Sequence, residues 1–141
     1  MRLAVDTNVL FSFFKKESTT RKLIASVELF ELCTLKSRIE ELKRYKEVIC
    51  KKAGITQREF NKSLKELKIF VEIIDDEKVK EFGKEALKIS PDREDAPLFA
   101  LALALNCEIW SNDKRLKNQN RIKVLSTSEI IKILKNFGIE V

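Results

Sequence analysis

Short apolar runs alternate along this chain with longer segments in which apolar residues recur at helical spacing. The runs are Leu3–Val5, Glu31–Leu35, Phe70–Ile74, Cys107–Trp110 and Ile122–Leu125. Runs of this length predict strands buried in a parallel sheet, and the periodic segments between them predict amphipathic helices. Strands that alternate with helices predict an α/β fold, in which helices cover both faces of a mainly parallel sheet.

Most of the predicted helices carry one apolar stripe. The segments are Thr19–Phe30, Arg38–Lys52, a helix after Thr56, Glu77–Ile89 and a last helix ending near Phe137. The side chains predicted to face inward are Leu23, Ile24, Val27, Ile39, Leu42, Tyr45, Ile49, Phe60, Leu64, Leu67, Val79, Phe82 and Ala86. By contrast, Ala96–Asn106 is apolar all round, which predicts a central buried helix.

Polar residues mark the ends of several helices. Three tetrads fit the capping box: Ser37–Glu40, Thr56–Glu59 and Ser126–Glu129. Further signals are an Asp75-Asp76 cap before Glu77, a stop at Gly54, and Ile55 with Phe60 as a hydrophobic staple. The first tetrad bears on function, because it assigns Glu40 a structural role and leaves its neighbour Glu41 free.

Length and composition indicate one globular domain over residues 1–141. No run of about 18 apolar residues is present, so we expect no membrane span. Asp6 interrupts the first apolar run, which argues against a signal peptide and predicts a cytoplasmic protein.

The charged residues indicate the partner and restrict the chemistry. A net charge of +6 favours polyanionic partners, above all nucleic acid, although the same lysines could simply be solvated faces of mixed Lys/Glu helices. The chain has no histidine, which excludes Ser-His-Asp and Cys-His mechanisms. Cys33, Cys50 and Cys107 form no CxxC pair, so we expect buried free thiols and no zinc site.

Four acidic residues are expected at one edge of the sheet. Asp6 and Asp113 each follow the end of a predicted strand, and Glu41 lies in the first turn of a helix that follows a strand. Asp95 opens the buried helix that runs back before the next strand, so it starts from the same edge. Ligands of open α/β sheets bind beyond these carboxyl ends.

Converging carboxylates need a counter-charge, because like charges raise one another's pKa. Mg²⁺ and Mn²⁺ supply it, prefer oxygen ligands, and support phosphodiester hydrolysis. Each acid also has a structural interpretation: Asp6 as a cap, Glu41 as a charge favouring the helix dipole, and Asp113 in an Asx-turn. For Asp95, the segment Asp92–Asp95 could be a cap with an acidic first turn. Their convergence is what favours the metal site.

Taken together, these residues resemble the PIN-domain ribonucleases, the family that includes the VapC toxins. The matching segments are Val5–Leu10 (VDTNVL), Glu41-Leu42, Asp95–Leu98 (DAPL), Ala100–Ala102 (ALA) and Trp110–Asp113 (WSND). The resemblance implies a three-layer α/β/α sandwich and Mg²⁺- or Mn²⁺-dependent cleavage of RNA. It implies metal-binding acids at Asp6, Glu41, Asp95 and Asp113, with Asn8 and Ser111 in support and Asp92 as an auxiliary acid.

The resemblance leaves the biological role open between a toxin and an RNA-processing enzyme. A toxin would need an antitoxin protein, for which Phe11, Phe13 and Phe14 or the Phe60 helix could form an apolar groove, unless these aromatics belong to the core. The family also implies a homodimer. Basic residues around Lys43-Arg44 and Lys114–Lys117 are expected to position phosphates.

Two other functions compete with ribonuclease activity. One is a catalytically idle nucleic-acid-binding module or RNA-processing scaffold with the same fold. The other is a haloacid-dehalogenase-like phosphatase, which also begins with a strand followed by Asp. That class needs a second Asp two positions later, where this chain has Asn8.

Overall fold

The computed structural model describes residues 1–26 and 28–140, and its strands form one parallel sheet. They are β1 (Arg2–Val5), β2 (Glu31–Leu35), β3 (Val71–Ile74), β4 (Glu108–Trp110) and β5 (Val124–Leu125). Their order is β3-β2-β1-β4-β5, and each neighbouring pair is parallel. The predicted parallel sheet is confirmed, with β1 as its central strand.

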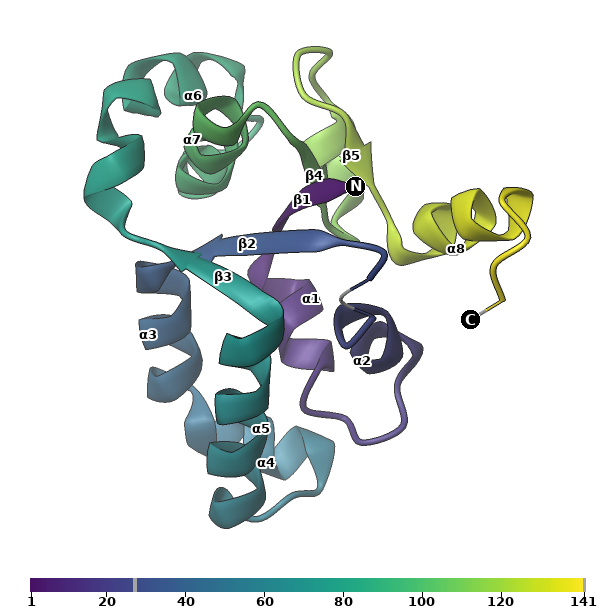
Figure 1. The fold of residues 1–141 in the computed structure, drawn as a ribbon. Helices are drawn as coiled ribbons and strands as arrows, with labels where there is room; N and C mark the ends of the chain where they lie inside the picture. Colours follow the sequence, from purple (N-terminus) through teal and green to yellow (C-terminus); the bar gives the residue numbers. More distant parts are fainter. Residues whose placement is uncertain (27, 141) are drawn as a thin grey trace.

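Helices connect the strands and form a layer on each face of the sheet. They are α1 (Thr7–Ser12), α2 (Thr19–Ile24), α3 (Lys36–Arg44), α4 (Lys46–Ala53), α5 (Gln57–Phe70), α6 (Gly83–Ile89), α7 (Ala96–Leu105) and α8 (Thr127–Asn136). Short 3-10 helices are η1 (Asp76–Phe82), η2 (Arg93–Asp95) and η3 (Lys114–Lys117). In Figure 1, α6 and α7 lie on one side of the sheet, and α1, α2, α3, α5 and α8 lie on the other. The α/β/α sandwich is therefore confirmed.

Alternate strand residues divide between two hydrophobic cores, one on each face. Leu3 and Val5 of β1 belong to the core that includes α1, α2, α5 and α8, whereas Ala4 belongs to the core that includes α6 and α7. Trp110 and Ile109 of β4 divide in the same way. This period of two is what a strand buried on both faces requires.

Several sequence predictions about the helices are confirmed. Helix α7 is buried at Ala96 and at Leu98–Ala102, as expected for a segment that is apolar all round. Thr56–Glu59 and Ser126–Glu129 both form reciprocal capping boxes. Gly54 ends α4 with a positive φ of 66°. The helix predicted over Thr19–Phe30 is shorter, since α2 ends at Ile24, and the inward position predicted for Val27 lies outside the described residues.

The capping predicted at Ser37 and at Asp75-Asp76 is wrong, and one contact explains both errors. Helix α3 begins at Lys36, two residues earlier than expected, and its N-cap has no side-chain hydrogen bond. The Asp76 carboxylate instead accepts hydrogen bonds from Ser37 N–H, at 2.9 Å, and from Ser37 Oγ, at 2.5 Å. Asp76 therefore caps a helix distant in sequence, while Asp75 makes no cap bond.

The helix predicted over Arg38–Lys52 is divided at Tyr45, where the backbone (φ −94°, ψ 17°) separates α3 from α4. Ile39, Leu42 and Ile49 are buried as predicted, but the Tyr45 position is 48% exposed, so its predicted place in the core is wrong. No glycine or proline lies at the break, so the usual sequence signals for a break are missing.

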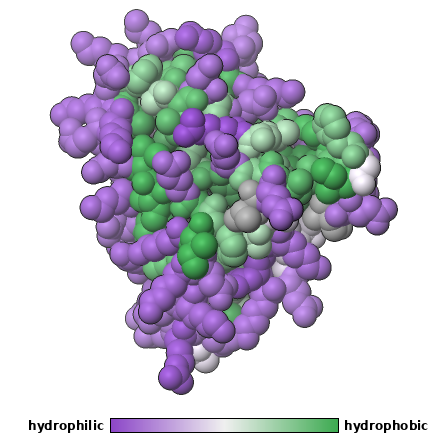
Figure 2. All heavy atoms as spheres, viewed as in Figure 1, coloured by the Kyte–Doolittle hydropathy of each residue, from purple (hydrophilic) through white to green (hydrophobic). Residues whose placement is uncertain are grey.

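The described residues contain no disulfide, and all three cysteines are free thiols as predicted. Cys33 is buried, but Cys50 and Cys107 are only partly buried. Among residues 1–26 and 28–140, no helix has the length and apolar character needed to cross a membrane. On the face shown in Figure 2, hydrophilic side chains cover the lower part of the molecule, over α3, α4 and α5.

Candidate active site at the carboxyl edge of the sheet

The carboxyl ends of β1 and β4 lie side by side, and each is followed by residues of the predicted site. Val5 pairs with Trp110, and the N–H of Asp6 donates to the Trp110 carbonyl at 3.0 Å. Because these strands are parallel neighbours, Asp6 and Ser111 leave the sheet at the same edge. The pairing thus brings together residues more than one hundred positions apart, as the topology predicted.

Polar neighbours orient the Asp6 carboxylate. Its Oδ2 accepts hydrogen bonds from Ser111 Oγ at 2.6 Å and from Asn8 Nδ2 at 3.3 Å, and its Oδ1 accepts from Thr7 N–H at 2.7 Å. Ser111 Oγ also accepts from the N–H of Asp113 at 3.0 Å. Asp6 is therefore the cap of α1, as its structural interpretation proposed, and it is also part of a network that reaches Asp113.

Asp113 follows β4 and is paired with an arginine. Its Oδ1 accepts from Arg115 N–H at 3.0 Å in the Asx-turn considered above, and its Oδ2 accepts from Arg115 Nη2 at 2.8 Å. This guanidinium holds the pKa of the Asp113 carboxyl below its usual value, against a smaller opposing effect of burial. The carboxylate is therefore charged, and most of its present partners come from one exposed side chain.

Asp95 lies just before α7 and experiences the other acids. Its own side chain makes no capping hydrogen bond, but it lies in the acidic first turn that Asp92 caps, as the structural interpretation of this segment proposed. Burial raises the pKa of the Asp95 carboxyl, and the negative charges of Asp6, Asp92 and Asp113 raise it further, while Arg115 opposes them. The structure therefore brings these four acids close enough to repel one another. Asp92 also caps η2 through Glu94 N–H.

Arg38 connects Glu41 to the turn that contains Asp95. The Glu41 Oε2 accepts from Arg38 Nη1 at 3.1 Å, and Arg38 Nη2 donates to the carbonyl of Glu94 at 3.2 Å. Arg38 therefore joins α3 to the acidic turn that precedes α7. Glu40 is exposed, whereas Glu41 is partly buried, so Glu41 remains the better candidate although the capping argument that first favoured it was wrong.

The donor set fits a hard divalent cation, although its present geometry is not that of a formed metal site. In the described part of the chain, no group of three Asp, Glu or Cys side chains is arranged to hold a metal ion. The donors are all oxygens, as Mg²⁺ and Mn²⁺ prefer. Asn8 Oδ1, beside Asp6, is buried without a hydrogen-bond partner, and the mutual repulsion at Asp95 marks an excess of negative charge.

Two arginines contact the predicted acids, and the sequence did not predict either contact. Arg38 was not singled out, and Arg115 was expected to contact phosphate, yet each pairs with a predicted acid. The Arg38–Glu41 pair has the i, i+3 spacing of helix ion pairs, which could have revealed it. The sequence indicated the Asx-turn at Asp113, but it did not indicate that the Arg115 guanidinium would bind the same carboxylate.

The fold and the acidic edge are typical of a nuclease, and comparison with known proteins agrees. The family model described as PIN domain matches residues 4–132, so the chain belongs to the PIN domain family. Membership of this family indicates a nuclease, that is, a hydrolase of nucleic acids. A chain in the crystal structure of VapBC2 from Rickettsia felis, bound to a DNA fragment from their promoter, has a similar fold, with a TM-score of 0.69 and 16% identity over 89% of this chain and 98% of that chain. No curated protein matches the sequence.

Proposed function

We propose that this protein is a metal-dependent endoribonuclease that hydrolyses RNA phosphodiester bonds. The observation that supports it best is the proximity of Asp6, Asp95 and Asp113 at the carboxyl edge of the sheet, where burial and the charges of Asp6 and Asp113 raise the pKa of the Asp95 carboxyl. The basic chain, with a net charge of +6, favours a polyanionic substrate. The absence of histidine leaves carboxylates as the acid-base groups of such a site.

Asp6, Glu41, Asp95 and Asp113 would hold Mg²⁺ or Mn²⁺, with Asn8, Ser111 and Asp92 in support. When bound, such an ion supplies an activated water and a counter-charge for the phosphate oxygens. Ser111 and Asn8 keep the Asp6 carboxylate in one orientation. Asp113 and Glu41 would give up their arginine partners to bind the ion. Arg115 and Arg38 would then be free to contact phosphate oxygens, which a guanidinium binds with two parallel hydrogen bonds.

Cleavage of a fluorescent single-stranded RNA tests this function. The wild type is expected to cleave in Mg²⁺ or Mn²⁺ and to stop in EDTA, and Asp6→Asn and Asp95→Asn are expected to lose at least 100-fold. Asp75→Asn is the matched control, because Asp75 is exposed and makes no capping bond. Full activity in EDTA would contradict the metal mechanism, and RNA binding without any cleavage would favour the idle scaffold.

The biological role that we propose is the toxin of a toxin–antitoxin pair acting in the cytoplasm. The similar fold of a chain in a VapBC complex bound to promoter DNA supports it. Expression is expected to arrest growth, and co-expression of a small DNA-binding protein encoded by a neighbouring gene is expected to relieve the arrest. Normal growth during expression of cleavage-active protein would favour RNA processing instead. The homodimer stays a prediction that sedimentation of the purified chain can test.

A further inference from the structure

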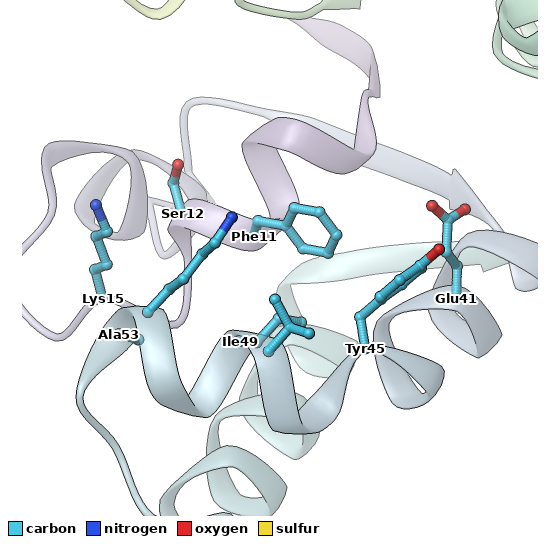
Figure 3. Close-up of a pocket in the computed structure, with 9 residues that line it drawn as sticks. Phe11, Ser12, Lys15, Glu41, Tyr45, Ile49 and Ala53 are labelled. Atoms are coloured by element: carbon cyan, nitrogen blue, oxygen red, sulfur yellow. The ribbon is translucent and has the colours of Figure 1, made fainter.

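A pocket of about 540 Å³ opens beside the candidate acid Glu41, between α1 and the α3–α4 segment (Figure 3). This volume is within the range of small-molecule binding sites. Glu41 lines the pocket and is one of the candidate metal-binding acids, so the pocket adjoins the candidate active site at this residue. Phe11, Tyr45 and Val48 supply apolar surface, and Lys15 and Lys52 supply positive charge.

Two aromatic rings in this pocket lack aromatic partners among the described residues. Phe13 and Phe14 are fully buried in the core and make ring contacts there, whereas Phe11 is 36% exposed and Tyr45 is 48% exposed. In Figure 3, the Phe11 ring and the Tyr45 ring extend toward the same space from opposite elements, and the Tyr45 hydroxyl is directed toward Glu41. The break between α3 and α4 removes Tyr45 from the core stripe and makes it available here.

The charges around the rings favour an anionic ligand. Lys15 and Lys52 are exposed, and neither forms an ion pair within the described part of the chain. Glu41, the acidic residue in the lining, is already paired with Arg38. An apolar pocket with two aromatic rings, flanked by two cations that form no ion pair among the described residues, is complementary to a polymer with one planar ring system and one negative charge in each unit.

We propose that this pocket binds an unpaired nucleotide of single-stranded RNA next to the scissile phosphate. The base stacks on Phe11 and Tyr45, and Lys15 and Lys52 contact the flanking phosphates. This inference rests on the proposed nuclease function and adds the path of the substrate. Single-stranded RNA fits because its bases are free to stack on aromatic side chains, whereas duplex bases are enclosed. An apolar protein segment would use the rings but not the two lysines.

Binding of a 5′-fluorescein-labelled 12-nucleotide single-stranded RNA, measured by anisotropy in EDTA, tests the pocket without cleavage. Tyr45→Ala is expected to weaken binding about tenfold, and Tyr45→Phe is expected to restore it, because stacking needs the ring and not the hydroxyl. The matched control is Phe137→Ala, at a 78% exposed aromatic near the end of α8, which is expected to bind like the wild type. Circular dichroism and melting temperature verify that each variant is folded.

Charge reversal tests the phosphate contacts separately. Lys52→Glu is expected to weaken binding about fivefold and to make the logarithmic salt dependence shallower by about 0.7, the value for one contact to a single strand. Lys88→Glu, an exposed lysine on α6, is the control for net charge. A 2-aminopurine base in the RNA is expected to lose fluorescence on binding to the wild type and to keep it with Tyr45→Ala, as stacking requires.

The outcomes separate this inference from the nuclease function. If Tyr45→Ala and Lys52→Glu bind RNA like the wild type while the wild type cleaves RNA, the pocket proposal is overturned and the nuclease function stands. If both variants lose RNA affinity but the wild type cleaves nothing in Mg²⁺ or Mn²⁺, the pocket proposal stands and the nuclease function fails. If Tyr45→Ala keeps RNA affinity but loses affinity for a purified antitoxin, the pocket is a protein-docking surface and the proposal is overturned.

Discussion

Ser111 determines how the Asp6 carboxylate is oriented, because its buried hydroxyl contacts three residues of the site. It donates to Asp6 Oδ2 and accepts from the backbone of Asp113 and from the Asn8 side chain, at 2.6, 3.0 and 3.4 Å. Ser111 is only 1% exposed, so water cannot easily replace these bonds. In the proposed nuclease it would act through Asp6, as a positioning residue.

Ser111→Ala is therefore expected to impair the site without removing a ligand. Loss of the hydroxyl leaves buried polar groups unpaired, which costs about 1–3 kcal/mol in the free energy of unfolding. Cleavage is expected to fall by about 10- to 100-fold, the usual effect of removing a group that orients a metal ligand. Urea unfolding and RNA cleavage measure both effects, and Ser128→Ala, at an exposed serine of α8, is expected to change neither.

Asp95→Asn is expected to have opposite effects with and without metal. In EDTA at pH 7, the variant is expected to melt at or above the wild-type temperature, because the raised pKa of Asp95 means that its charge destabilises the folded state. This difference is present above the raised pKa and disappears below about pH 3.8, where Asp95 is neutral in both states. Mn²⁺ at 100 times the dissociation constant is expected to stabilise the wild type by about 2.7 kcal/mol, and the variant much less.

Differential scanning fluorimetry at several pH values, with EDTA or Mn²⁺, measures these differences. Asp75→Asn is expected to follow the wild type in every condition. A wild type that melts at the same temperature in Mn²⁺ and in EDTA would show that these acids do not bind the ion.

The helices show which signals can be read from sequence and which cannot. At Thr56 and Ser126 the predicted partners, three residues apart, do bond to each other. The boundary at Ser37 was missed because its hydroxyl bonds to Asp76, 39 residues away. Local patterns therefore predict a helix end when the chain supplies its own cap, and fail when tertiary structure supplies another.

Substitution of two glycines at helix ends should have opposite effects on stability, because their backbone conformations differ. Gly54 has a φ of +66°, and Gly83, in the first turn of α6, has a φ of −60°, with no atom within 4 Å of an added Cβ at either position. Gly54→Ala is expected to lower the free energy of unfolding by about 1–2 kcal/mol, because an L residue is strained in the left-handed region. Gly83→Ala is expected to raise it by about 0.5–1 kcal/mol. Urea unfolding of the two variants measures the contrast, and equal effects would contradict it.

Glu59 links the α5 capping box to solution pH. Lys16 and the Thr56 backbone lower the pKa of the Glu59 carboxyl from 4.5 to about 2. A lowered pKa contributes stability that is present above pH 4.5 and is lost as the pH falls toward about 2. Glu59→Gln keeps a capping side chain but loses the charge, so it is expected to be less stable than the wild type at pH 7 and equal to it near pH 2. Unfolding free energies at pH 7, 4 and 2.5 measure this convergence.

Over the whole molecule, alternation of strands and helices was enough to predict the parallel sheet and the edge where the acids meet. Asp6, Asp95 and Asp113 could be placed because each adjoins a strand end or the start of α7. The arginine partners and the exposed Tyr45 could not, because they depend on side-chain geometry and on the break between α3 and α4. The number and position of bound ions stay predictions for the same reason.

The net charge predicts how RNA binding responds to salt. Lysines and arginines exceed acids by six over the chain, and hydrophilic side chains cover the helical end seen in Figure 2. If about four phosphates are contacted, the slope of log affinity against log salt is expected to be about −2.8. Anisotropy titrations between 50 and 300 mM KCl in EDTA measure it, and affinity independent of salt would contradict phosphate recognition.

The central position of β1 has a consequence for synthesis of the chain. During synthesis β1 leaves the ribosome long before β4, which pairs with it and is followed by Ser111 and Asp113. A nascent chain that lacks residues 108–113 cannot assemble the acidic edge, so we expect any nuclease activity to be absent until these residues have been translated. The topology would thereby delay the proposed cleavage of RNA, without a separate inhibitor, for as long as translation has not reached β4.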